Sequence, residues 1–236
     1  MIISEEKIYQ HGAVTLKGWI FYTPSQEPKP GIIVAHDWTG CGDMAKERAR
    51  LLAEQGYVAF AIDMYGEGRM GQTNEEKQAL MLPIISNRAL LRERMIVALT
   101  VLKESPQVKA NYIAAIGFCF GGLCVLDLAR TGADIKAVVS FHGLLHQDTE
   151  FHSKEIKANV LVLHGYDDPM VSSADVQQFC AEMTTLKAKW QMNIYGNTSH
   201  AFTNPLAHDH QLGLVYEPDT ARKAFQAMDA LFSEVL

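Results

Sequence analysis

The sequence lacks the features that mark several large classes of protein. Its 236 residues carry a formal net charge of −6 and give a pI near 5.8, so no excess of basic residues is available to neutralise phosphates. Its apolar runs are short and interrupted by charges, unlike a membrane-spanning segment. The start of the chain, Met-Ile-Ile-Ser-Glu-Glu-Lys, has neither the basic residues nor the apolar stretch of a secretion signal. We therefore expect a cytoplasmic protein that binds neither nucleic acid nor a membrane.

Cysteine is scarce, and its spacing does not indicate paired use. The four cysteines, Cys41, Cys119, Cys124 and Cys180, form no CxxC pair and are too sparse for a disulfide framework. This pattern fits a reducing compartment, in which each cysteine is a single thiol. Only Cys119 has glycines two residues before and after it, at 117 and 121, and we expect the other three cysteines to be inert.

The order of apolar segments predicts an α/β fold in one domain, residues 1–236. Residues 8–21 alternate around Gly12, which predicts an antiparallel hairpin. Residues 31–35 form a continuous apolar run, typical of a strand buried on both faces of a parallel sheet. Strands and helices then alternate, which predicts a mostly parallel sheet with helices on both faces. The predicted helices are 44–54, 86–103, 120–130, 174–183 and 220–235, and the predicted strands are 57–63, 112–117, 137–141, 160–164 and 190–195.

Residues 115–122, Ala-Ile-Gly-Phe-Cys-Phe-Gly-Gly, place a cysteine between glycines where a predicted strand meets a predicted helix. This spacing matches the G-x-nucleophile-x-G elbow, a turn so tight that side chains two residues either side of the nucleophile would collide. The start of a helix favours the reactive thiolate of Cys119, and the Phe120 N–H would face a developing oxyanion. The competing interpretation is a buried structural cysteine beside a glycine turn.

A cysteine nucleophile needs a base and an acid that orients the base. Asp168 follows the predicted strand 160–164, and His200 follows the predicted strand 190–195. The chain order of nucleophile, acid and histidine is the order found in the α/β-hydrolase fold. Asp167 stands beside Asp168, and spacing alone leaves open which of the two is the orienting acid.

The sequence resembles the dienelactone hydrolase family, cysteine hydrolases of α/β-hydrolase fold. The resemblance implies a triad of Cys119, Asp168 and His200, with the backbone N–H groups of Trp38 and Phe120 as oxyanion donors. It implies no cofactor and no metal. The motifs that carry it are Gly-Ile-Ile-Val-Ala-His-Asp-Trp-Thr-Gly at residues 31–40, Ala-Ile-Asp-Met-Tyr-Gly at 61–66, the elbow at 117–122, Gly-Tyr-Asp-Asp at 165–168 and His-Ala-Phe at 200–202.

Two positions depart from the family pattern. The family's type members carry a glutamate linked to control of the thiol where this chain has Asp37, a shorter carboxylate. Members that cleave dienelactone resemble one another in an arginine that holds the substrate carboxylate, and this chain has Asn204 there. Either Arg69 or Arg88 would restore the missing charge if it faced the pocket, although a solvated surface arginine is the commoner case.

Other polar residues near the predicted site have simpler interpretations. Residues 65–73 form a glycine-rich irregular stretch that suits a pocket rim. His36, His142 and His164 end predicted strands, where hydrogen-bonded structural histidines are commoner than catalytic ones. The run His-Asp-His at 208–210 invites a metal interpretation, but without a third ligand at a suitable spacing we expect a polar loop.

These observations predict an ester hydrolase similar to carboxymethylenebutenolidase, which cleaves a small ester, lactone or thioester through a thioacyl-enzyme. The small-molecule substrate is its expected partner, and a homodimer is compatible with the sequence. Two alternatives stay open: a hydrolase-fold protein that binds a ligand or partner without turnover, and a transacylase. The sequence does not name the acyl or leaving group.

Overall fold

The computed structural model describes residues 1–236, which fold around one eight-stranded sheet. The strand order is β1-β2-β4-β3-β5-β6-β7-β8. β1 and β2 form an antiparallel hairpin, β2 pairs antiparallel with β4, and all the remaining pairs are parallel. The strands are β1 (Ile3–His11), β2 (Val14–Tyr22), β3 (Lys29–Ala35), β4 (Val58–Ile62), β5 (Val108–Phe118), β6 (Ala137–Phe141), β7 (Asn159–Gly165) and β8 (Lys189–Tyr195). The predicted mostly parallel α/β-hydrolase sheet with its N-terminal hairpin is confirmed.

The central strands are buried on both faces, as their continuous apolar runs predicted. On β3, Ile33 and Ala35 belong to one apolar core, whereas Ile32 and Val34 belong to another on the opposite face. All four side chains are fully buried. Because successive side chains of a strand point to opposite faces, such a strand must be apolar at every position.

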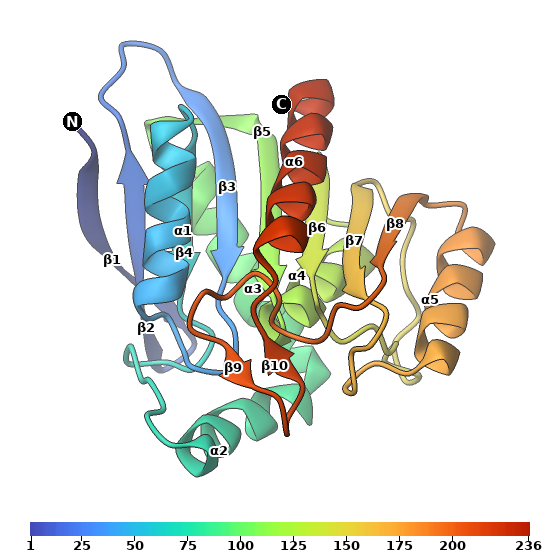
Figure 1. The fold of residues 1–236 in the computed structure, drawn as a ribbon. Coiled ribbons are helices and arrows are strands. Elements are labelled where there is room, and N and C mark those ends of the chain that lie inside the picture. Colours follow the sequence, from blue (N-terminus) through green and yellow to red (C-terminus); the bar gives the residue numbers. More distant parts are fainter.

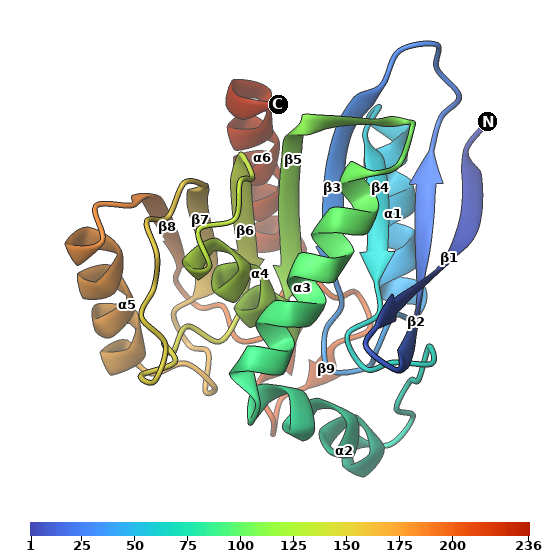
Figure 2. The same ribbon diagram turned by 180° about the vertical axis from the view of Figure 1, so that it is seen from behind.

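Helices cover both faces of the sheet (Figures 1 and 2). α1 (Asp43–Glu54) and α6 (Pro218–Val235) lie on one face, and their buried residues form a core with alternate strand residues. α3 (Arg88–Lys103), α4 (Phe120–Arg130) and α5 (Ser173–Thr185) cover the other face. No helix has the length and apolar character needed to cross a membrane.

Beyond the carboxyl ends of the parallel strands lie α2 (Asn74–Ile85) and the short pair β9 (His208–Asp209) and β10 (Leu214–Val215) (Figure 1). The sequence interpretation missed α2, because its apolar residues follow no single stripe and only Ile84 is buried. A helix-start signal was nevertheless present: Thr73 and Glu76 form a capping box. The predicted polar loop at 208–210 is instead partly strand.

Candidate active site

Cys119 lies between the end of β5 and the start of α4, in a backbone conformation that is rare for a non-glycine residue. Its φ is 53° and ψ is −114°, and its N–H donates to the Phe141 carbonyl at 3.0 Å. A Cβ at Gly117 would collide with the carbonyl of Gly121, so the turn excludes a side chain at this position. The glycines therefore permit a turn that holds Cys119 out of the strand, at the amino end of α4.

The end of β3 passes directly against the same turn. A Cβ at Gly121 would collide with the carbonyls of Ala35 and His36. This close approach brings the segment after β3 to the pocket that Cys119 lines, and Asp37 and Trp38 line that pocket too. No backbone carbonyl accepts from the Trp38 N–H, which leaves this donor available. Asp37 accepts through Oδ1 from the Thr39 N–H at 2.8 Å and from its hydroxyl at 2.5 Å.

Asp168 and His200 follow β7 and β8 and meet at the same edge of the sheet. The distance between Asp168 Oδ2 and His200 Nδ1 is 2.8 Å, and both side chains are buried. Asp168 Oδ1 accepts from the Met170 N–H at 2.8 Å, which fixes the carboxylate plane. Asp167 is exposed to solvent, whereas Asp168 lies at the imidazole of His200.

The outer nitrogen of His200 faces the cysteine rather than a structural partner. Burial lowers the pKa of His200, but the charge of the Cys119 thiolate and the interaction with Asp168 outweigh it, raising the pKa from 6.5 to about 10. No hydrogen bond of normal geometry joins Nε2 to another group, although the atom is buried. Nε2 is therefore free to exchange a proton with the thiol or with a bound molecule.

Cys119 and His200 open into a pocket of about 610 Å³, a size that suits a small organic molecule. Segments distant in sequence form it: the turn after β3, α2, the elbow, the turn after β6 and residues 200–214. The other lining residues are Asp37, Trp38, Thr39, Met44, Asn74, Lys77, Gln78, Met81, His142, Leu144, Met170, Ala201, Asn204, Leu206, Ala207, His208, Asp209, Leu212 and Leu214.

Of the predicted substrate-contact residues, Asp37 and Asn204 line this pocket, whereas Arg69 and Arg88 do not. The Arg69 guanidinium donates to the carbonyls of Tyr65 and Gly66 and so closes its own turn. Arg88 forms a largely buried ion pair with Asp127, so it is neither a pocket cation nor a solvated surface residue. The prediction that residues 65–73 form the pocket rim is wrong, because none of them lines the pocket. The following helix, α2, lines it instead.

Sequence reasoning overlooked Lys77, the one lysine or arginine that lines the pocket. Its ammonium lies 5.2 Å from the centre of the Trp38 ring and has no carboxylate partner. The residue belongs to α2, and only recognition of that helix from its capping box would have drawn attention to it.

Three further buried histidines surround the site. His36 accepts through Nε2 from the Met64 N–H at 3.2 Å and supports the turn after β4. His142 contacts the ring of His200, and His164 is the next-to-last residue of β7. Burial lowers the pKa of all three below its usual value, so they are neutral near pH 7.

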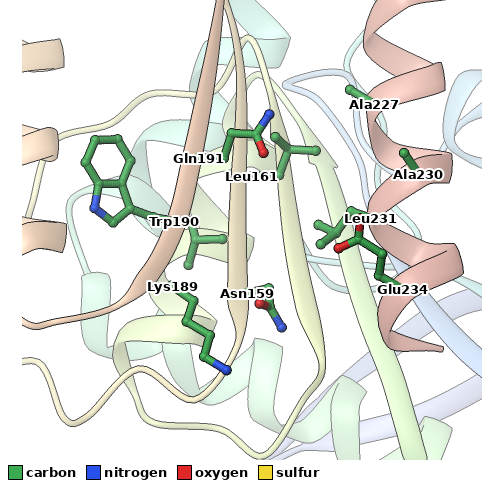
Figure 3. A pocket seen from close by; sticks show the side chains of 10 residues that line it. Asn159, Leu161, Lys189, Trp190, Gln191, Ala227, Ala230, Leu231 and Glu234 are labelled. Atoms are coloured by element: carbon green, nitrogen blue, oxygen red, sulfur yellow. The ribbon is translucent and has the colours of Figure 1, made fainter.

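A second pocket, of about 380 Å³, lies between β7, β8 and α6 (Figure 3). Asn159 and Lys189 begin their strands, so this pocket is at the amino ends of the strands, away from Cys119. It contains no cysteine or histidine, and therefore no nucleophile with a base. Among residues 1–236, no group of His, Cys, Asp and Glu side chains is arranged to hold a metal ion.

Several known proteins have sequences similar to that of this chain. The profile of the Dienelactone hydrolase family matches residues 17–236. "Protein usf" of Aquifex pyrophilus is 29% identical over 97% of each chain, and a probable 2-oxo-3-(5-oxofuran-2-ylidene)propanoate lactonase of Bradyrhizobium is 29% identical over 83% of this chain and 80% of its own.

Solved structures agree with the sequence comparisons. The structure of m3DLH superimposes with a TM-score of 0.95 and 38% identity, covering 100% of this chain and 99% of its own. A dienelactone hydrolase-like promiscuous phosphotriesterase from metagenomic libraries gives a TM-score of 0.94 and 37% identity, covering 99% and 98%. The sequence motifs, the fold and these likenesses lead to one conclusion: the chain belongs to the dienelactone hydrolase family and is a hydrolase of ester bonds.

Proposed function

We propose that the protein is a cysteine hydrolase of small esters, lactones or thioesters, with Cys119 as nucleophile, His200 as base and Asp168 as the acid that orients it. The observation that carries this proposal is the convergence of three chain segments on one pocket. Cys119 occupies a strained elbow, His200 Nε2 lies buried and free beside it, and Asp168 holds Nδ1 at 2.8 Å. Both cores and the sheet draw on residues throughout the chain, so we treat 1–236 as one catalytic domain.

The first half of the reaction forms the thioacyl-enzyme. The Cys119 sulfur attacks the substrate carbonyl carbon while His200 holds the thiol proton as an imidazolium that Asp168 stabilises. Negative charge develops on the carbonyl oxygen and is stabilised by the N–H groups of Trp38 and Phe120, the latter at the amino end of α4. The carbon–oxygen bond of an ester or lactone, or the carbon–sulfur bond of a thioester substrate, then breaks, and His200 gives its proton to the leaving alkoxide or thiolate.

The second half releases the acid. His200, now neutral, takes a proton from a water molecule that attacks the thioester carbon. The tetrahedral intermediate uses the same two oxyanion donors and collapses by breaking the carbon–sulfur bond. Cys119 leaves as thiolate beside the imidazolium, which restores the starting pair. No step requires a metal or cofactor.

The pocket supports a small substrate with an apolar body. Met44, Met81, Met170 and Trp38 supply adaptable apolar walls, and the 610 Å³ volume fits a molecule of drug-like size or smaller. Asn204 offers a neutral amide where dienelactone-cleaving relatives resemble one another in an arginine, so Lys77 is the cation available to an anionic substrate group.

A cysteine hydrolase and a non-catalytic binding protein should respond differently to changes at Cys119. In a cysteine hydrolase, Cys119→Ala should abolish turnover of any ester that the wild type cleaves and leave the fold intact, because the change is small. Cys119→Ser should be weak, since a hydroxyl depends more on its base than a thiol does. An inert binding pocket would hydrolyse nothing in a panel of lactones, aryl esters and thioesters, and Cys119 would resist iodoacetamide near neutral pH.

Two further reactions belong in the same panel. A transacylase would transfer the acyl group to an added alcohol or amine faster than to water, so product ratios distinguish it from a hydrolase. Phosphotriester hydrolysis is a second candidate activity, favoured by the 37% identical relative that is described as a promiscuous phosphotriesterase. Loss of that activity in Cys119→Ala would show that the same nucleophile attacks phosphorus.

A further inference from the structure

His142 directly follows β6 and makes three side-chain contacts with one short segment that contains the proposed base. Its ring packs edge-on against His200, with ring centres 5.1 Å apart and an interplanar angle of 61°. It packs in the same way against Phe202, also at 5.1 Å. Its Nε2 forms a hydrogen bond of 2.8 Å with the Thr203 hydroxyl. This bond joins His142 to the segment 200–203, although about 60 positions separate them in the chain.

The main chain of His142 is itself held in an unusual position. Its φ of 39° lies in the left-handed region, which non-glycine residues rarely adopt. Its N–H donates to the Leu163 carbonyl of β7 at 2.8 Å, which anchors the turn to the sheet. A strained conformation that is retained at a pocket wall is a sign of a functional constraint.

The orientation of the buried His200 ring depends on its hydrogen bond to Asp168 and on the side chains that pack around it. The single hydrogen bond to Asp168 fixes Nδ1, but the ring can still tilt about that bond. Backbone hydrogen bonds from the Val215 N–H to the His200 carbonyl and from the Glu217 N–H to the Phe202 carbonyl fix the main chain, but they do not act on the ring. The His142 ring packs against the His200 ring in an edge-on arrangement, so removing it would open space beside His200 into which the imidazole could turn away from Cys119.

We propose that His142 is a positioning residue, which holds the ring of His200 and its loop through the ring contact and the Thr203 hydrogen bond. This inference rests on the proposed triad and adds a residue to it. The titratable group that acts on His142 is His200, and the groups that interact with His200 are Cys119, Asp168 and the buried His164. Burial, reinforced by the nearby positive charge of His200, lowers the pKa of His142 well below 6.5, so a neutral ring lies beside the imidazolium.

The test compares variants that remove each contact. His142→Phe keeps an aromatic ring and loses the hydrogen bond, Thr203→Val loses the same bond from the other side, and His142→Ala loses both contacts. Thr220→Val is the matched control, because its hydroxyl bonds Thr198 near the other end of the loop at 3.1 Å. Each variant is assayed for kcat, KM, Tm and the pH midpoint of iodoacetamide alkylation at Cys119, read by peptide mass.

We expect kcat to fall about 10-fold in His142→Phe and in Thr203→Val, and up to about 100-fold in His142→Ala, with KM little changed. The double variant His142→Phe/Thr203→Val should be no worse than either single variant, because both remove one bond. The alkylation midpoint should move to higher pH in His142→Ala, in the direction of His200→Ala. Thr220→Val should match the wild type in kcat and midpoint.

Two results separate the failure of this inference from that of the triad. If His142→Ala and Thr203→Val lower Tm but keep the wild-type kcat and alkylation midpoint, His142 is only structural and the inference is overturned. If His200→Ala itself leaves turnover and the midpoint unchanged, the triad and the inference fail together. Should His142→Ala not fold, Thr203→Val alone decides, since its kcat either falls or matches that of Thr220→Val.

Discussion

The carboxylate of Asp168 and the imidazole of His200 lie 2.8 Å apart, both buried, although 32 positions separate them in the chain. Each follows a parallel strand of the sheet, and the pairing of β7 with β8 sets their distance. The neighbouring Asp167 points to solvent. Of these two adjacent aspartates only Asp168 contacts His200, so substitutions at the two positions should differ in their effect on activity.

Asp168→Asn should lower kcat/KM by about 10²- to 10⁴-fold, because an amide neither selects the required tautomer of His200 nor stabilises its positive charge. Asp167→Asn, one position away and exposed, is the matched control and should stay close to wild type. Steady-state kinetics on one ester substrate check both. A larger loss in Asp167→Asn would transfer the orienting role to that residue.

The raised pKa of His200 should depend on Cys119. Removing the thiolate charge in Cys119→Ala should lower the pKa of His200 from its value of about 10, while the interaction with Asp168 remains. An NMR titration of the imidazole Cε1 proton measures it directly. An unchanged value in Cys119→Ala would mean that Asp168 alone sustains the shift.

The same shift predicts how stability varies with pH. Because the folded-state pKa of His200 exceeds its unfolded value of 6.5, the protonated ring stabilises the fold fully below that pH. The stabilisation is lost as the pH rises through about 10. Wild type should therefore lose more stability than His200→Gln between pH 6.5 and pH 10, as measured by urea unfolding. Parallel losses in the two proteins would contradict this account.

Lys77 should determine how the enzyme treats charged substrates. Lys77→Gln should lower kcat/KM for a carboxylated lactone about tenfold or more, and leave its methyl ester unaffected, because a charge-assisted hydrogen bond is lost. Lys46→Gln is the matched control, since Lys46 also lies over a tryptophan, Trp19, but outside the pocket. An equal loss for both substrates would show that Lys77 acts on the pocket's shape rather than on charge.

Gly121→Ala should destabilise the fold and reduce activity together. The new Cβ would meet the backbone carbonyls of Ala35 and His36, so α4 and the end of β3 must separate at a cost of about 1–3 kcal/mol. Gly196→Ala is the control, because a Cβ there has no atom within 4 Å. Urea unfolding measures both, and equal stability of the two variants would contradict the packing argument.

Local patterns predicted the elements that the sheet buries. The helix over 120–130 and the strand over 137–141 match α4 and β6 to the residue, since glycines and continuous apolar runs mark their limits. α2 was missed because it is largely exposed, and Lys77 was missed with it. Arg88 was misjudged because its partner Asp127 is 39 positions away on another helix, and spacing does not reveal such a pairing.

Cys119, Asp168 and His200 each follow a predicted strand, which indicated that they lie at the carboxyl end of the sheet, and the structure has them there. The sequence did not indicate the contacts of His142, since these join the turn after β6 to a loop about 60 positions later. Contacts of this kind depend on side-chain directions at strand ends, which only the folded structure fixes. The roles of the three residues in catalysis remain a prediction.

The measurement that tests the central claim most directly is the mass of the protein during turnover. Wild type is mixed with an excess of an aryl ester, quenched in acid within milliseconds, and analysed as intact protein and as peptides. A thioacyl-enzyme predicts an added mass of one acyl group on the peptide that contains Cys119, absent in Cys119→Ala, which should also be inactive. An acyl group on another residue, or turnover by Cys119→Ala at the wild-type rate, would contradict the account.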